Sequence, residues 1–359
     1  MASPSRKPLR VALQGGGALG AYSAGVLDAL LASRRVELTH FSGTSAGAIN
    51  AVVCASALAR GGRPAARRAL ASFWQDIAAS PFGDYVGLLW GPIGQTLRQR
   101  VGEWIWYSTA SLPSPYGGQL LPSPAATPLA TVLARHVDFD ALRAPAAAQV
   151  FVTVTHVATG LPRVFGNAEL SLDAILASAC LPQYFRAVEI DGDAYWDGGY
   201  TGNPTLWPLI RQPGASDVLL VQLAPAQAGA TPTSAAGVRQ RIAEIVFHSS
   251  LVAEMQAVQA LRESAQARGD ANRFSEARFH RIGPPPEALL GAGASVDRSP
   301  AFLRALGEAG GRDARAFLAR HGDRIGVAET LDLRATFIAP HKTRLVARGA
   351  EVSTPALAA

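Results

Sequence analysis

Each of two consecutive stretches near the N-terminus begins with a short apolar run and continues with apolar residues at helical spacing. Residues 9–14, LRVALQ, and residues 36–42, VELTHFS, are typical of buried strands. Residues 18–33 and 48–59 place apolar side chains three and four positions apart, which predicts a helix after each strand. Two strand-to-helix units in succession are typical of a parallel sheet that is covered by helices on both faces.

The rest of the chain adds further strands and helices to this beginning. Gly61 and Gly62 are expected to end the second helix, and Pro64 to open another. An Asp191-Gly192 turn predicts a hairpin between two short strands. Further strands are predicted at residues 149–157, 217–225 and 278–282, a long helix at 235–269 and a helical pair at 299–322.

Periodicity is lost between residues 80 and 128, where proline, glycine, tryptophan and tyrosine are frequent. Long irregular segments in compact domains often cover a site, so this insertion predicts a lid or an acyl-chain pocket. Under that interpretation Trp90, Trp104 and Trp106 would contact an apolar substrate. The alternative is an insertion with a small core of its own, and the sequence alone favours neither.

The composition is that of a globular protein with a large core. Of 359 residues, 48% are apolar and 17% are charged, and the net charge is +6. Nearly all basic residues are arginine, since Lys7 and Lys342 are the only lysines. Basic residues do not cluster with aromatic ones, so we expect no nucleic-acid partner. One arginine cluster predicts either a solvated helix start or a patch for lipid phosphate groups: Arg60, Arg63, Arg67 and Arg68.

The cysteines and the N-terminus indicate a protein of a reducing compartment. Cys54 and Cys180 lie in small apolar runs, which is typical of buried thiols rather than of a disulfide framework. Too few apolar residues precede the first glycines for a signal peptide. Residues 41–59 are uncharged, but their serine, threonine and asparagine residues make a poor membrane span. We therefore expect a cytoplasmic protein that is compatible with peripheral contact at a membrane or lipid surface.

A glycine-rich turn follows the first predicted strand. Residues 15–20, GGGALG, satisfy the G-x-G-x-x-G spacing, and Glu37 lies near the next strand, as in a dinucleotide-binding fingerprint. The same turn would also present backbone N–H groups at a helix N-terminus, where such donors stabilise an oxyanion. A tight turn without a function is the third interpretation.

A second turn places a serine between strand and helix. Residues 43–47, GTSAG, match the G-x-S-x-G pattern, in which small neighbours allow a strained turn to expose the serine hydroxyl. Ser45 is therefore a candidate nucleophile, and a simple helix cap is the alternative. Only one strand precedes the strand of Ser45, which argues against the α/β-hydrolase fold. Four histidines in ordinary helix or strand contexts are not expected to be the base: His136, His156, His248 and His280.

An acidic residue ends a later predicted strand. Asp197 precedes Gly198 and Gly199, so its carboxylate would lie beside a backbone that is free to turn tightly. A carboxylate held against a serine hydroxyl can accept its proton directly, without an intervening histidine. Asp191 and Asp193 are explained by the hairpin turn, and no further ligands are spaced for a metal site.

In this order, the three motifs resemble the signatures of patatin-like phospholipases, from about Leu9 to Ile210. By that resemblance the fold would be α/β, a three-layer α/β/α sandwich with a mainly parallel central sheet, to which a helical C-terminal extension is added. Ser45 would be the nucleophile and Asp197 the base of a Ser-Asp dyad. The oxyanion hole would be the backbone of Gly15, Gly16 and Gly17, and the supporting motif glycines would be Gly20, Gly43, Gly47, Gly198 and Gly199.

The resemblance implies hydrolysis of lipid acyl esters through an acyl-enzyme, with no metal or organic cofactor. We expect a catalytic domain at residues 9–212, strands and helices at 213–347 packed on the same domain, and a frayed tail at 348–359. Acyl transfer to an alcohol would use the same residues. A catalytically inactive lipid-binding or partner-binding protein also stays open, because Leu19 stands where the family commonly has arginine or lysine.

Overall fold

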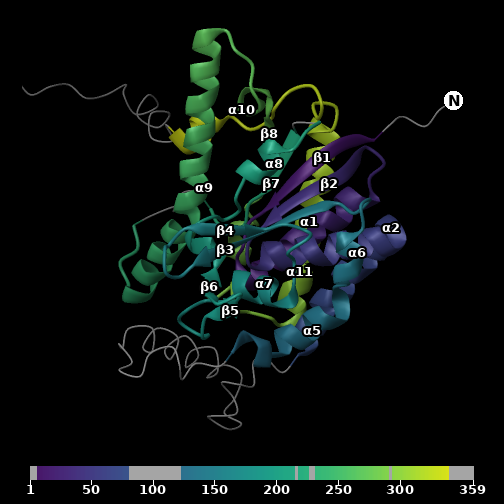
Figure 1. Ribbon diagram of the computed structural model, residues 1–359, viewed down its shortest axis with the longest axis vertical. Coiled ribbons are helices and arrows are strands. Elements are labelled where there is room, and N and C mark those ends of the chain that lie inside the picture. Colours follow the sequence, from purple (N-terminus) through teal and green to yellow (C-terminus); the bar gives the residue numbers. More distant parts are fainter. Residues whose placement is uncertain (1–5, 81–122, 215–216, 226–230, 291–292, 339–359) are drawn as a thin grey trace, which may run out of the picture.

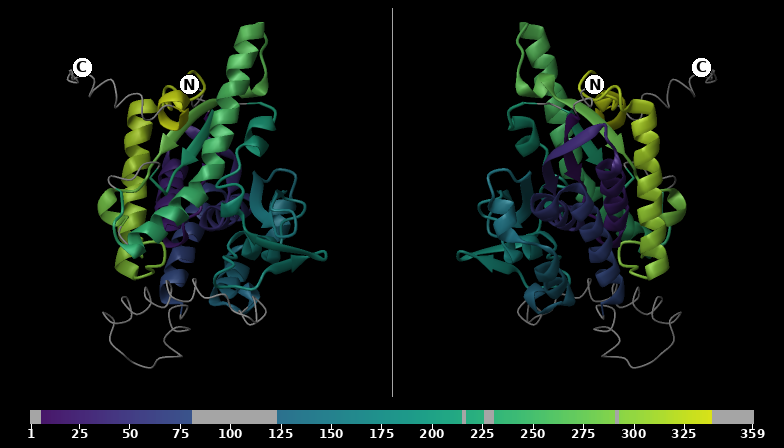
Figure 2. Two further views of the ribbon diagram at one scale, coloured as in Figure 1. Left: turned by 90° about the vertical axis from the view of Figure 1, so that its left-hand side faces the viewer. Right: turned by 90° about the vertical axis from the view of Figure 1, so that its right-hand side faces the viewer.

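The computed structural model describes residues 6–80, 123–214, 217–225, 231–290 and 293–338 (Figure 1). Most of the predicted insertion at 80–128, with Trp90, Trp104 and Trp106, lies outside these residues, as does the predicted tail at 348–359. The predictions for both segments stay predictions. The described elements form three layers, in which one sheet lies between two sets of helices (Figures 1 and 2).

One mainly parallel sheet of eight strands forms the middle layer. Neighbouring strands β3, β2, β1, β7 and β8 pair in parallel, whereas β4, β5 and β6 pair antiparallel at the β3 edge. The carboxyl ends of β1, β2 and β7 therefore meet at one edge of the sheet. The strands are β1 (Lys7–Leu13), β2 (Val36–Gly43), β3 (Gln149–His156), β4 (Pro162–Phe165), β5 (Val188–Ile190), β6 (Asp193–Asp197), β7 (Asp217–Val221) and β8 (Arg278–Ile282).

Helices cover both faces of the sheet, and each face has its own apolar core. Leu9, Val11 and Leu13 of β1 join the core on the side of α1, α2 and α11, while Ala12 joins the core on the side of α9. This alternation along one strand is expected for a sheet buried on both faces. The helices are α1 (Gly20–Ala32), α2 (Ala46–Ala79), α5 (Pro128–His136), α6 (Phe139–Arg143), α7 (Leu172–Ser178), α8 (Trp207–Arg211), α9 (Ala235–Arg268), α10 (Arg273–Glu276) and α11 (Pro300–His321), with short turns that include η1 (Gly17–Leu19), η5 (Gly198–Tyr200) and η7 (Arg334–Ile338).

Most of the predicted elements are confirmed. Strands β1, β2, β3, β7 and β8 and the β5-β6 hairpin lie where the apolar runs predicted strands. Helix α9 begins after the Ser234 cap and ends at Arg268, before the cap residue Gly269, whose φ of 69° is left-handed. Gly61 and Gly62 interrupt α2 with non-helical dihedral angles before Pro64, as expected for two successive helices.

The predicted helical pair at residues 299–322 is wrong, because α11 is one continuous helix. Gly310 lies at the middle of this helix and packs against α1, since a Cβ atom there would lie 2.0 Å from the carbonyl oxygen of Tyr22. The Tyr22 hydroxyl also donates a hydrogen bond to Asp313 at 2.6 Å. Close contact with α1 accounts for glycine in the interior of an unbroken helix.

The arginine cluster of α2 divides between two roles. Arg60 and Arg67 are solvated and form surface ion pairs with Asp138 and Asp28, which confirms the solvated interpretation for them. For Arg63 that interpretation and the phosphate patch are both wrong. Its guanidinium donates hydrogen bonds to four backbone carbonyl oxygens around the end of α1, those of Leu30, Leu31, Ser33 and Val36. Arg63 thus satisfies carbonyl groups that the end of a helix leaves unpaired.

Cys54 and Cys180 are both buried free thiols, as predicted. Burial raises the pKa of the Cys54 thiol to about 12, so this side chain is neutral at physiological pH. No helix in the described part of the chain is long and apolar enough to cross a membrane.

Candidate active site

Ser45 lies in a strained turn between β2 and α2. Strand β2 ends at Gly43 and α2 begins at Ala46, so Ser45 occupies the cap position. Its φ of 54° and ψ of −124° belong to a region that residues with a Cβ atom rarely adopt. The side chain makes no capping hydrogen bond, which excludes the simple-cap interpretation. The turn leaves the Ser45 hydroxyl available for chemistry.

The small residues of the GTSAG motif allow α2 to begin directly on the end of β1. A Cβ atom at Gly47 would lie 2.1 Å from the carbonyl oxygen of Leu13. A Cβ atom at Gly43 would lie 2.5 Å from the backbone of Gly47. Any side chain at either position would push the helix away from the sheet and move the serine with it.

Two neighbouring hydroxyl groups hold the strained turn in place. The Ser45 N–H donates to Ser178 Oγ at 2.9 Å, and the Ser178 hydroxyl donates to the Thr153 carbonyl oxygen at 2.7 Å. The Thr44 hydroxyl donates to the Gly202 carbonyl oxygen at 2.5 Å. Ser178 was not predicted as a site residue, because a buried serine at the end of a short helix has no sequence pattern that sets it apart.

Asp197 is the last residue of β6 and is fully buried. Its Oδ1 accepts a hydrogen bond from the Gly199 N–H at 2.7 Å. Its Oδ2 is also buried and has no hydrogen-bond partner in the described part of the chain. The residue between Asp197 and Gly199 must be glycine, because a Cβ atom at Gly198 would lie 2.1 Å from the Thr153 carbonyl oxygen. One oxygen of the carboxylate therefore fixes its orientation and the other stays available.

Burial raises the pKa of the Asp197 carboxyl from 3.8 to about 7. The hydrogen bond from the Gly199 amide and the proximity of the Ser45 hydroxyl lower it in part. No hydrogen bond of full geometry joins the Ser45 hydroxyl to the buried Oδ2 among the described residues. Such contacts often tighten only when substrate binds. Ser45 and Asp197 are thus adjacent, and the carboxyl titrates near neutral pH.

None of the histidines in the described residues hydrogen-bonds to Ser45 or Asp197. His248, on α9, lies beside Gln14, with 3.5 Å between His248 Nδ1 and Gln14 Nε2. The other candidates bond to carboxylates away from the serine: His136 to Asp76, His156 to Asp193 and His280 to Asp217. The prediction that these histidines serve structural roles agrees with their contacts.

The glycine loop lies against the serine turn. A Cβ atom at Gly15 would lie 2.9 Å from Ser45 Cβ, so the two motifs are in contact. The Gly15 N–H already donates to Asn203 Oδ1 at 2.7 Å. The N–H groups of Gly16 and Gly17 have no acceptor within the described ranges. Of the three predicted oxyanion donors, the Gly15 N–H is therefore occupied, and the other two have no acceptor among the residues that the structure describes.

The side chains of Asn203 and Gln14 connect the glycine loop to neighbouring segments of the chain. Asn203 Nδ2 donates to the Phe247 carbonyl oxygen at 3.0 Å, which connects the loop to α9. Gln14 Oε1 accepts from the N–H groups of Leu223 and Ala224 at 2.8 and 2.9 Å. Neither residue was predicted as part of the site. Asn203 could have been suspected, since it closes the same YWDGGYTGNP segment that contains Asp197.

Leu19 is buried in the core on the α1 side. Its side chain therefore packs inward and adds no charge to the loop. Gly20, which follows it, allows α1 and α2 to begin in contact, because a Cβ atom at Gly20 would lie 2.7 Å from Ala46 Cβ. The starts of both helices thus meet at the serine, where their partial positive charges favour an anion.

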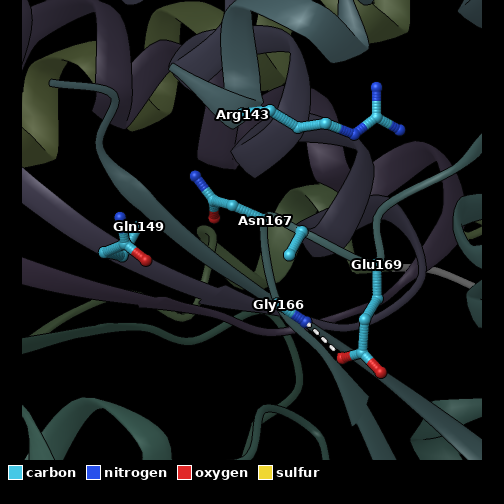
Figure 3. A pocket seen from close by; sticks show the side chains of 6 residues that line it. Arg143, Gln149, Gly166, Asn167 and Glu169 are labelled. Atoms are coloured by element: carbon cyan, nitrogen blue, oxygen red, sulfur yellow. Dashed lines mark hydrogen bonds between the residues drawn. The ribbon is translucent and has the colours of Figure 1, made fainter. Parts of the chain in front are cut away.

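A surface hollow of about 470 Å³ lies apart from these residues. Figure 3 shows its lining, where the Gly166 N–H donates to Glu169 at 3.4 Å. Asn167 is engaged by backbone groups and Glu169 by Arg163, so the hollow offers no available nucleophile. Among the described residues, no cluster of histidine, cysteine, aspartate and glutamate is arranged to hold a metal ion.

The assembled site consists of a strained serine, a buried carboxylate and a glycine loop, and the sequence around it matches a known family. The model of that family, described as patatin-like phospholipase, matches residues 11–210, more than half of the chain. The chain belongs to the patatin-like phospholipase family. This membership places the protein among lipid acyl hydrolases, and the resemblance found from the three motifs is confirmed.

Solved structures with some likeness to this patatin-like chain include bacterial proteins. VipD from Legionella pneumophila is 13% identical with a TM-score of 0.40, over 96% of this chain and 75% of VipD. The ExoU-SpcU complex from the type III secretion system of Pseudomonas aeruginosa gives 18% identity and a TM-score of 0.32, over 96% of this chain and 77% of that chain. Among curated proteins, none matches the sequence.

Proposed function

We propose that this protein hydrolyses acyl esters of lipids, with Ser45 as the nucleophile and Asp197 as the general base. The main support is the contact between a serine in a strained turn and a fully buried carboxylate whose second oxygen has no partner in the described part of the chain. A carboxyl group whose pKa is raised to about 7 suits proton transfer at neutral pH.

Acylation begins when Ser45 Oγ attacks the carbonyl carbon of the ester and passes its proton to Asp197. The new C–O bond moves the carbonyl electrons onto oxygen, and the free N–H groups of Gly16 and Gly17 donate to this oxyanion. The tetrahedral intermediate collapses and the alcohol leaves with the proton from Asp197. The product is an acyl-enzyme on Ser45.

Deacylation repeats these steps with water. Asp197 accepts a proton from the water molecule that attacks the acyl carbon, and the same amides stabilise the second oxyanion. Ser45 Oγ then leaves and recovers its proton from the carboxyl group, which releases the fatty acid. No separate group is needed for the two proton transfers, because Asp197 alternates between base and acid.

Covalent labelling gives a direct test of the nucleophile. A fluorophosphonate with an alkyl chain should form one stable adduct on Ser45, located by peptide mass spectrometry, and should abolish hydrolysis of p-nitrophenyl esters in step with labelling. Serines of ordinary reactivity, such as Ser178, should stay unmodified and serve as the internal control. An enzyme that hydrolyses esters but is labelled elsewhere would contradict the assignment of Ser45.

Activity should depend on pH through Asp197. Because the carboxyl must be ionised to accept the serine proton, kcat/KM for a soluble ester should rise as pH increases through about 7 and level off above that value. Initial rates across a pH series measure this profile.

Glu254 supplies the matched control for the pH profile. Burial raises its pKa to about 7 as well, but it accepts hydrogen bonds from the Leu206 and Trp207 amides at the start of α8 and does not contact the serine. Glu254→Gln should therefore leave the midpoint of the profile unchanged. Loss of the transition near pH 7 in Glu254→Gln would show that the titration belongs to Glu254 and not to Asp197.

A further inference from the structure

The first half of α9 places polar side chains toward the protein and apolar side chains toward solvent. Arg241 and Glu244 form an ion pair at 3.1 Å, and their side chains are only 24% and 26% exposed. Ile242 and Ile245, their immediate neighbours in sequence, are 56% and 51% exposed. This is the reverse of the usual arrangement for a helix on a soluble protein, in which the apolar face is buried.

Four large apolar residues form this exposed face, which we call the α9 strip: Val238, Ile242, Ile245 and Val246. Their spacing of three and four positions places them on one side of the helix. The second half of α9 returns to the usual arrangement, since Leu251, Met255 and Val258 are buried. The exposed apolar surface is therefore concentrated at one end of the helix, where contiguous patches commonly mark contact sites.

The α9 strip is adjacent to the candidate active site. Phe247, the residue after Val246, packs so closely on the loop of Asp197 that a Cβ atom at Gly199 would lie 2.2 Å from its ring. The ring centroids of Phe247 and Tyr200 are 5.0 Å apart. The Phe247 carbonyl oxygen also accepts from Asn203, which fixes the glycine loop. Helix α9, drawn in green in Figure 1, packs against η5, the turn that directly follows Asp197. One short segment thus joins the exposed strip to both parts of the site.

We propose that the α9 strip docks on a lipid surface and brings the candidate active site to the lipid whose ester it cleaves. The proposal rests on the proposed function, because the acyl ester of a phospholipid lies at the boundary of the lipid phase. An apolar strip that lies parallel to that boundary can bury its side chains among acyl chains. The net charge of +6 also favours binding to lipid surfaces that carry negative charge.

Vesicle binding tests the surface without requiring turnover. The double variant Ile242→Gln with Ile245→Gln removes half of the strip, and glutamine preserves helix propensity. Its partition onto phosphatidylcholine vesicles that contain phosphatidylglycerol, measured by co-sedimentation, should be roughly 10- to 100-fold weaker than that of the wild type. Hydrolysis of a soluble short-chain ester should be unchanged, whereas hydrolysis of the vesicle lipid should fall with binding.

Leu261→Gln is the matched control, since Leu261 is an equally apolar residue of the same helix, 43% exposed, but in its far half. This variant should bind vesicles as the wild type does. The proposal is overturned if the double variant binds vesicles as the wild type does, or if the wild type does not bind vesicles. It is also overturned if gel filtration shows that the wild type is a dimer, that the double variant is a monomer, and that vesicle binding is unchanged. Vesicle binding and ester hydrolysis are measured separately. A protein that binds vesicles but hydrolyses no ester would therefore contradict the proposed function and still support the α9 strip as a lipid-binding surface.

Discussion

Ser45→Ala and Asp197→Asn should each lower the hydrolysis of a soluble ester by at least about three orders of magnitude, because the two residues act as one unit. Ser45→Ala removes the atom that forms the acyl-enzyme. Asp197→Asn removes the proton acceptor, while an amide oxygen can still accept from the Gly199 N–H as Oδ1 does at 2.7 Å. The double variant should be no slower than either single variant. Steady-state kinetics with p-nitrophenyl esters measures all three.

Stability provides a second readout for Asp197→Asn. The folded-state pKa of about 7 lies above the ordinary value of 3.8, so ionising this carboxyl costs folding free energy as pH rises from the lower value through the higher one. The neutral amide avoids that cost. The variant should therefore melt at a higher temperature than the wild type above pH 7, and the advantage should disappear in acid.

Asp193→Asn is the control for the loss of activity, since Asp193 begins the same strand with its side chain 61% exposed. It should retain activity. An active Asp197→Asn beside an inactive Ser45→Ala would mean that another group takes the serine proton, and the proposed dyad would be wrong.

Local motifs explain why so much of this fold was predictable. The positions of Gly43, Ser45 and Gly47 predict a strand, a tight turn and a helix within a few residues, and two such units in succession predict a parallel sheet covered by helices on both faces. The hairpin at Asp191 and Gly192 is equally local, and both residues have the positive φ that the turn requires.

Contacts between distant segments were not predictable from local patterns. Gly310 remains helical because it packs against Tyr22, nearly three hundred positions away in the chain. Arg63 caps the preceding helix instead of facing solvent. Each of these contacts depends on which surfaces pack together in the folded protein. Neither the apolar periodicity nor the spacing of charges along the chain predicts that packing.

The candidate site shows the same division. The three motifs identified Ser45 and Asp197 as candidates. The glycine motif, however, does not tell which of the amides at 15, 16 and 17 can bind an oxyanion. The hydrogen bond to Asn203 distinguishes them, since it occupies the Gly15 amide, whereas the next two amides have no acceptor among the described residues. Ser178, which fixes the nucleophile turn, belongs to none of the motifs.

Gly17→Ala should lower kcat by about 10²- to 10³-fold, the usual cost of losing one oxyanion donor. Gly17 has a φ of +59°, and a Cβ atom there would lie 2.3 Å from the Ser295 carbonyl oxygen. An alanine must therefore move the loop and with it the Gly17 amide. The loss should appear mainly in kcat, because the amide binds charge that develops only in the transition state.

Gly16→Ala separates this effect from simple crowding of the loop. The nearest neighbour of its Cβ atom would be the end of the flexible Leu223 side chain, at 3.1 Å, and the φ of Gly16 is extended, so the backbone amide can stay in place. We expect a much smaller loss of kcat than for Gly17→Ala, with circular dichroism confirming that both variants fold. A folded Gly17→Ala enzyme with the kcat of the wild type would remove this amide from the mechanism and leave the oxyanion to Gly16 alone.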